Sequence, residues 1–166
     1  MSAPDFDIAS SRATDDGTLE YVGFWVRVGA SLIDTALVIA LTTPLIHWAY
    51  GDTYWSNTSF YKGPADLLIT YLLPIIAVLW FWIARQATPG KMLFGARIVD
   101  ARTGGKPTVG QLLLRYIGYY PSIFVGFLGL MWVGWDARKQ GWHDKIANTV
   151  VIRRRKRGIQ PVRFGG

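Results

Sequence analysis

Three long stretches of the chain are apolar and almost free of charge, at positions 28–46, 67–83 and 112–135. A run of roughly 18 such residues can cross the hydrocarbon core of a bilayer, about 30 Å thick, as an α-helix. A soluble domain of 166 residues rarely contains even one run of this kind. Charged residues make up only 17% of the chain, against about 25% in soluble proteins. The sequence therefore predicts an integral membrane protein built mainly from helices.

The expected fold is all-α and membrane-embedded, with two full transmembrane helices. The first helix should span about 22–50 and the second about 64–84, joined by a short polar loop. The third apolar segment, about 111–135, contains Pro121 and several glycines, so we expect it to be interrupted. Two forms of this segment are open, a re-entrant hairpin and a single span.

The distribution of positive charge predicts the orientation. Of the eighteen Lys and Arg residues, five lie between the second and third apolar segments and nine follow Trp135, whereas the loop at 51–63 carries only Lys62. Loops rich in Lys and Arg remain on the cytoplasmic side of a membrane. We therefore expect a multi-pass protein of the inner (plasma) membrane with both termini in the cytoplasm. Because a single crossing of the third segment would separate the two basic groups, we favour the re-entrant hairpin.

The regions outside the apolar segments are expected to form a small β element and two distinct ends. Residues 93–100 are rich in strand formers, and 148–152 offer a partner strand, so we expect a small cytoplasmic β element. The membrane domain should cover 21–153, preceded by a flexible acidic leader at 1–20 and followed by a basic tail at 154–166. Five consecutive cations are expected to contact the anionic lipids of the bilayer: Arg153, Arg154, Arg155, Lys156 and Arg157. The net charge of +7 could also suggest a nucleic-acid partner, but no nucleic-acid motif accompanies it, so none is expected.

Arg27 and Asp34 in the first predicted helix are the most informative polar residues. They are seven positions apart, so both project from one face, separated by about 10 Å along the helix axis. An ionised Asp near the middle of a membrane costs roughly 2.5–3.5 kcal/mol and therefore needs a partner or a function. Arg115 is the best partner by type and depth. Three roles are open for Asp34: a member of an intramembrane charge cluster with Arg27 and Arg115, a protonated hydrogen-bonded acid, and a packing lock between helices.

The sequence Trp142-His143-Asp144 places a His–Asp pair near the C-terminus. We expect neither catalysis nor metal binding there, because no nucleophile or third ligand accompanies the pair and the chain has no cysteine. Asp144 is instead expected to cap a short helix from Lys145 onward, or to bind a cation from the basic loop. No catalytic residue, metal or cofactor is predicted, and the protein is not expected to be an enzyme.

Several of these motifs together resemble the RDD family of membrane proteins, which is named for one arginine and two aspartates. The resemblance covers about 21–153 and rests on Arg27, Asp34, Arg115, the turn Thr88-Pro89-Gly90-Lys91 that leads into 96–100, and the stretch 140–151 with Trp142, His143, Asp144 and Thr149. It implies that Arg27 is the family's arginine, Asp34 its first aspartate and Asp144 its second. Transport of ions or small ligands has been suggested for the family.

Two functions follow as expectations. The first is handling of ions, protons or small ligands through the cluster of Arg27, Asp34 and Arg115. The alternative is a non-catalytic accessory or assembly subunit, which would use its many aromatic residues to contact a larger membrane complex. Because two or three spans are few for a transporter, we expect either a homo-oligomer or a larger complex.

Overall fold

The computed structural model describes residues 19–154, which form two compact units. The hairpin unit is Trp25–Phe94, and the sheet unit combines the described residues before and after it, 19–24 and 95–154. The predictions for 1–18 and 155–166, including those for Arg155, Lys156 and Arg157, lie outside the described residues. We describe each unit by itself.

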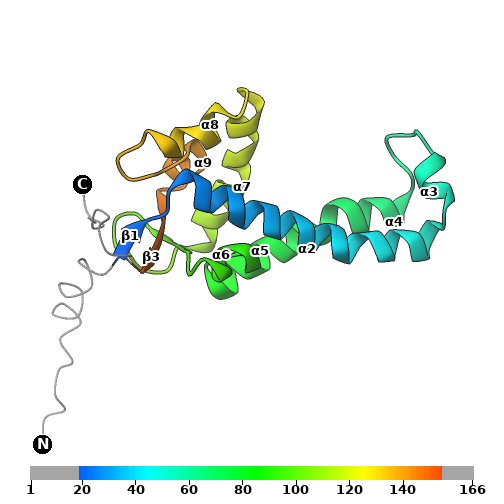
Figure 1. Cartoon of the computed structure of the whole chain (residues 1–166), viewed down its shortest axis with the longest axis horizontal. Coiled ribbons are helices and arrows are strands. Elements are labelled where there is room, and N and C mark those ends of the chain that lie inside the picture. The colour runs from blue at the N-terminus through cyan, green and yellow to red at the C-terminus, as the bar shows by residue number, and fades with distance from the viewer. Residues whose placement is uncertain (1–18, 155–166) are drawn as a thin grey trace, which may run out of the picture. The chain divides into compact units, whose positions relative to one another are not determined.

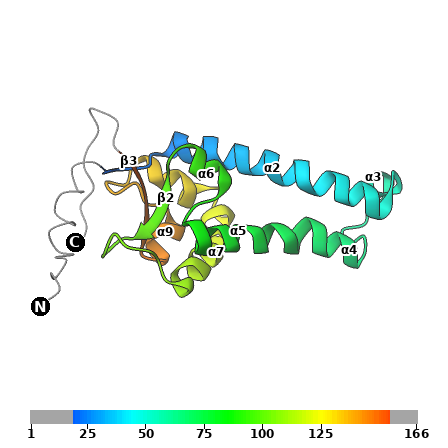
Figure 2. The same cartoon turned by 90° about the horizontal axis from the view of Figure 1, so that it is seen from below.

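The hairpin unit consists of two long apolar helical segments joined by a loop. Helix α2 covers Phe24–Tyr50, and the second segment, Pro64–Arg85, is formed by α4 (Pro64–Asp66), the π-helical turn η1 (Leu67–Leu72) and α5 (Leu73–Arg85). Figures 1 and 2 both show α2 running beside this second segment. Both are long and apolar enough to cross a membrane. The two predicted transmembrane helices are thus confirmed as helices, with ends within two residues of the predicted ones.

A proline explains the wide π-helical turn in the second segment. Pro74 lacks an N–H, and its ring would collide with the carbonyl oxygen of Thr70 in a regular helix. The turn immediately before it, Leu67–Leu72, widens to a π-helix and so accommodates the ring without ending the segment.

Polar contacts fasten the loop end of the hairpin unit. Asp66 is buried, and its carboxylate accepts hydrogen bonds from the hydroxyls of Tyr54 (2.7 Å) and Thr70 (2.8 Å). Its backbone N–H donates to the hydroxyl of Tyr50 at the end of α2 (2.8 Å). The short helix α3, Thr53–Ser56, lies in the connecting loop. The loop end therefore has its own network of hydrogen bonds, which does not depend on packing between the apolar faces.

The sheet unit contains a three-stranded antiparallel sheet in the order β1-β3-β2. Strand β2 (Arg97–Asp100) pairs with β3 (Thr149–Arg154), Val99 opposite Val150, which confirms the predicted β pairing. Figure 2 shows these two strands next to each other. Leu19, Val99, Ala101, Val150 and Ile152 form the apolar core of the sheet.

A third strand, which the sequence did not predict, occupies the other edge of β3. Strand β1 is Leu19–Tyr21, so two residues that we had assigned to the flexible leader, Leu19 and Glu20, are ordered in the sheet. The Glu20 carboxylate is fully buried and accepts a hydrogen bond from Arg153 directly opposite on β3 (2.5 Å). An opposite-charge pair across two strands stabilises the sheet, which is consistent with an acidic residue at this position.

The third apolar segment is interrupted as expected, but the break lies at one of its glycines and not at Pro121. Helix α7 (Val109–Phe124) passes straight through Pro121, and the chain turns by 114° before α8 (Leu128–Met131) and the 3-10 turn η2 (Trp132–Gly134). The break lies at Gly126 and Phe127, both of which have positive φ angles, near 61° and 62°. Such backbone cannot continue a right-handed helix. The broken form of this segment is therefore supported, although Pro121 does not cause the break.

Candidate functional site

The carboxylate of Asp34 joins α2 to the start of a short helix, α6 (Pro89–Leu93). Its Oδ2 accepts a hydrogen bond from the Thr88 hydroxyl (2.5 Å), and its Oδ1 accepts one from the Gly90 N–H (2.7 Å). The first N–H groups of a helix have no partner inside the helix, so an acceptor from elsewhere in the fold satisfies them. Asp34 supplies that acceptor from 56 positions away in the sequence.

Gly90 allows this contact because α6 lies directly against α2. A Cβ atom at this position would lie 2.1 Å from the backbone oxygen of Ala30 and 2.9 Å from Cγ of Asp34. Pro89 begins α6, where its missing N–H costs nothing. Lys91 is buried, with its Nζ 5.4 Å from the centre of the Trp82 ring, an arrangement that favours a cation–π contact. In the predicted turn motif, Thr88 and Gly90 therefore contact Asp34, whereas Lys91 lies beside Trp82.

A cavity of about 120 Å³ lies next to the Asp34 carboxylate, within the hairpin unit. Its walls come from α2 and α5, and Asp34 and Thr88 are its only polar lining residues among those that the structure describes. The apolar lining residues are Leu37, Val38, Leu41, Pro74, Ala77, Val78, Phe81 and Pro89. Asp34 is half-buried, and both of its hydrogen-bond donors are neutral groups. Within the described residues of the hairpin unit, hydrogen bonds rather than a cation hold this carboxylate.

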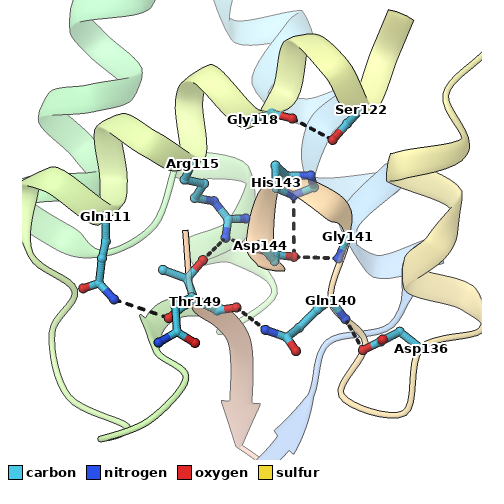
Figure 3. Close-up of polar contacts among 11 residues, drawn as sticks. Gln111, Arg115, Gly118, Ser122, Asp136, Gln140, Gly141, His143, Asp144 and Thr149 are labelled. Carbon is cyan, nitrogen blue, oxygen red and sulfur yellow. Dashed lines mark hydrogen bonds and ion pairs between the residues drawn. The ribbon is translucent and has the colours of Figure 1, made fainter. Parts of the chain in front are cut away.

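A second aspartate, Asp144, is at the centre of a buried network in the sheet unit (Figure 3). Its Oδ1 forms an ion pair with Nη1 of Arg115, and its Oδ2 accepts a hydrogen bond from the Gly141 N–H (3.1 Å). Nη1 of Arg115 also donates to the Thr149 hydroxyl (2.9 Å), while the Gln140 amide donates to the Thr149 carbonyl (2.8 Å). The side chains of Arg115 and Asp144 are both fully buried. The network joins α7, α9 (Trp142–Ile146) and β3.

His143 packs α9 onto α7. Its ring stacks on the Tyr119 ring, with the ring centres 4.0 Å apart, and its Nε2 lies 3.5 Å from Oδ2 of Asp144. Gly118 allows the two helices to approach closely, because a Cβ there would lie 2.9 Å from Cα of His143. The neighbouring Trp142 lies beside Trp132, with ring centres 6.3 Å apart. The Trp-His-Asp sequence thus serves to pack and fasten a short helix.

Comparison with known proteins identifies the family. The profile described as "RDD family" matches residues 21–148. The chain belongs to the RDD family. A Rickettsia prowazekii protein is 37% identical over 80% of this chain and 96% of its own length. A Bacillus subtilis protein named as an uncharacterised membrane protein, YteJ, is 28% identical over 88% of this chain and 89% of its own length. A mycobacterial proline-rich antigen homologue is 27% identical over 51% of this chain and 38% of its own length.

No solved structure matches the chain significantly. The family, the membrane relative and the apolar helices together support a small integral membrane protein. Within residues 19–154 this RDD-family chain is mostly helical, with two helices that are able to span a membrane, or three if the bent segment is one span, and a small sheet.

The residues that suggest the RDD resemblance are divided between the two units. Arg115, predicted as the partner of Asp34, is paired with Asp144 instead. Asp34 contacts the turn motif, and Arg27 is half-buried in α2. A guanidinium as completely buried as that of Arg115 needs a carboxylate in direct contact, and α9 provides one. Trp142, His143, Asp144 and Thr149 do come together, in the sheet unit.

Asp144 caps a helix, as the sequence predicted, but the helix starts earlier. Helix α9 begins at Trp142 rather than at Lys145, and Asp144 reaches back to the N–H of Gly141 from the third helical position. Among the described residues, no group of three or more His, Cys, Asp and Glu side chains is placed to hold a metal ion.

Gln111 is a structural residue that our reading of the sequence missed. It closes a capping box with Thr108 at the start of α7, and its amide donates to Asp100 at the end of β2 (2.6 Å). Burial raises the pKa of Asp100, but hydrogen bonds from Gln111 and from the N–H groups of Thr103 and Arg102 outweigh this effect and bring the pKa below its ordinary value of 3.8. The spacing Thr-x-x-Gln before an apolar run was the available signal.

Proposed function

We propose that this RDD-family protein handles a small cation or a proton at Asp34 in its membrane hairpin, without enzymatic chemistry. The observation that carries the proposal is a half-buried carboxylate, held by two neutral donors, at the edge of a cavity between the two apolar helices. The hydrogen bonds offset part of the cost of placing Asp34 in a membrane span, roughly 2.5–3.5 kcal/mol. They leave its negative charge to be balanced by a ligand.

The carboxylate also has free acceptor capacity. An ionised carboxylate has about four lone-pair positions for hydrogen bonds or cations, and Thr88 and Gly90 occupy one on each oxygen. In a purely structural site we would expect the charge of the carboxylate to be balanced within the chain, as Arg115 balances that of Asp144. The contrast between the two aspartates supports a ligand-related role for Asp34.

Replacing Asp34 by Asn and by Leu distinguishes a role of its negative charge in transport from a role of its side chain in folding. In Asp34→Asn the amide oxygen can still accept from Gly90 and the amide N–H can donate to the hydroxyl of Thr88, so we expect normal amounts of folded protein. Cation-dependent proton flux into proteoliposomes should nevertheless fall about tenfold or more, because charge-assisted hydrogen bonds are the strong ones. Asp34→Leu should lose both folded protein and flux.

The matched control is Asp52→Asn, which removes a carboxylate that is 96% exposed in the loop of the same hairpin. This variant should keep wild-type abundance and flux. The proposal fails if Asp34→Asn transports like the wild type, or if no cation gradient drives proton movement in vesicles that hold the unaltered protein.

The strand pairing supports a topology in which the helical hairpin and the third apolar segment each start and end on the same side of the membrane. Strand β1 precedes α2, β2 follows α5, and β3 follows α9, yet all three strands share one sheet. A hydrogen-bonded sheet has to lie in a single compartment. The hairpin helices would therefore cross out and back, and the α7–α8 segment would re-enter. The excess of Lys and Arg supports a cytoplasmic location for the sheet and both termini, at the inner (plasma) membrane.

Single cysteines test this topology directly, since the chain has none of its own. We expect cysteines at Lys106 and Arg154 to be protected in intact cells from a membrane-impermeant maleimide and to react after permeabilisation. A cysteine at Thr53 should react in intact cells. Labelling of Lys106 and Arg154 from opposite sides would rule out the re-entrant segment.

The alternative function is that of an accessory subunit, and one observation favours it. Only 6% of the most apolar part of each long helix is buried within the chain, so most of this surface is available to lipid or to a partner. Purification in a mild detergent distinguishes the two functions. Co-migration with one larger complex would favour the accessory role, whereas a homo-oligomer that retains cation flux would favour ion handling. In either case the exposed Arg154 at the end of β3 is proposed to contact anionic lipid, whereas Arg153 is paired with Glu20.

A further inference from the structure

We propose that the cavity beside Asp34 binds a short primary alkylammonium ion, with its ammonium group on the carboxylate and its alkyl chain between α2 and α5. This inference rests on the proposed function and specifies the chemical class of the cation. The negative charge of Asp34 and the shape of the cavity determine the class of ligand that we expect.

The walls of the cavity form two matching apolar faces. On α2 the lining residues after Asp34 are Leu37, Val38 and Leu41, and on α5 they are Pro74, Ala77, Val78 and Phe81. Both sets follow the spacing i, i+3, i+4, i+7, which keeps their members on one side of a helix. From Asp34 to Leu41 the axis advances about 10 Å. An alkyl chain that starts at the carboxylate therefore meets apolar side chains over its whole length.

The volume limits the size of the ligand. The cavity measures about 120 Å³, somewhat less than an engineered cavity of roughly 150 Å³ in another protein that binds benzene. About four to six non-hydrogen atoms fill such a space. Butylammonium, with four carbons and one nitrogen, meets this limit.

The polar end of the cavity suits an ammonium group better than a bare metal ion. An –NH3⁺ group donates three hydrogen bonds. Three acceptors are present, because Oδ1 and Oδ2 of Asp34 have unused lone pairs and the Thr88 hydroxyl can accept while it donates to Oδ2. A hard divalent cation takes about six oxygen ligands, and the other lining residues of the cavity offer apolar side chains.

Binding of butylammonium chloride to the purified full-length protein in lipid nanodiscs tests the proposal by calorimetry. Butanol, which has the same alkyl chain but no charge, serves as the control ligand. We expect saturable binding of butylammonium, weakened about ten- to a hundredfold in Asp34→Asn by loss of the charge-assisted bonds. Butanol should bind weakly to both proteins.

A cavity-filling variant separates this proposal from the proposed function. Ala77→Leu adds bulk to the lining while leaving Asp34 intact, and Ala84→Leu makes the same change on an exposed part of α5. We expect Ala77→Leu to weaken butylammonium binding about tenfold and Ala84→Leu to leave it unchanged. If Asp34-dependent proton flux persists while butylammonium fails to bind the unaltered protein, the alkylammonium site is refuted and the proposed function stands.

Three other outcomes would also overturn the alkylammonium site. Equal affinity of the unaltered protein, Asp34→Asn and Ala77→Leu would show that butylammonium partitions into lipid. Binding that occurs in nanodiscs of phosphatidylcholine but disappears in nanodiscs of phosphatidylethanolamine would assign the site to a lipid amine. A change in oligomeric state caused by Ala77→Leu would instead assign the apolar faces to a second copy of the chain.

Discussion

The variant Arg115→Met is expected to lower the free energy of unfolding of the sheet unit by about 3–5 kcal/mol, the largest effect predicted for this protein. The side chains of Arg115 and Asp144 are both fully buried and form an ion pair. Methionine would leave a carboxylate buried without its cation, although the Gly141 N–H would still donate to it. A loss of this size approaches the whole stability of many small domains. The measurement is thermal unfolding in detergent, together with the amount of folded protein recovered.

Two further variants show whether the loss comes from the unpaired charge. Arg102→Met removes an exposed arginine from the same unit and should change stability little. The double variant Arg115→Met with Asp144→Leu removes both charges and should recover part of the lost stability, since an apolar pair often replaces a buried ion pair well. If Arg115→Met alone were as stable as the wild type, the network would not hold α7, α9 and β3 together.

The variant Gly90→Ala is expected to prevent α6 from docking on α2 and to lower the yield of folded protein severely. The added Cβ would lie 2.1 Å from the Ala30 backbone oxygen and 2.9 Å from Cγ of Asp34. Overpacking in a core costs about 1–3 kcal/mol and more where the neighbour cannot move. Since the nearest atom belongs to the backbone, no side-chain change at Ala30 would relieve the contact.

Gly110→Ala provides the matched control, because its added Cβ would approach no atom closer than 3.9 Å. Alanine also has the higher helix propensity at this position in α7, so this variant should be as stable as the wild type or slightly more stable. The comparison is made by size-exclusion chromatography in detergent and by protease resistance of the 89–93 segment. Equal resistance of the Gly90→Ala and Gly110→Ala proteins would contradict the close packing of α6 on α2.

Asp34 and Asp144 make similar hydrogen bonds, but the charges of their surroundings differ. Each accepts a hydrogen bond from the backbone at the start of a short helix, Asp34 at α6 and Asp144 at α9. Asp144 is fully buried and neutralised by an arginine, which fits a purely structural role. Asp34 is half-buried beside a cavity, with neutral donors. This contrast is the basis of our proposal that Asp34 handles a ligand, whereas Asp144 stabilises the fold.

The helical membrane segments and the main strand pair could be predicted from the sequence alone, for a physical reason. A bilayer imposes a minimum length of apolar helix, so α2 and the Pro64–Arg85 segment are visible as uninterrupted hydrophobic runs. Strand formers between turns likewise indicated β2 and β3. These signals depend on neighbours in the sequence and on solvent, and they do not require knowledge of distant contacts.

The partners of the charged residues were decided only by the tertiary structure. Charge type and estimated depth suggested that Arg115 would pair with Asp34, yet Arg115 meets Asp144, 29 positions away, because α7 and α9 pack through Gly118 and His143. Likewise, Glu20 is buried in the sheet opposite Arg153 on β3, 133 positions away in the sequence. A buried charge takes the partner that packing brings within a few ångströms, and a linear sequence does not contain that distance.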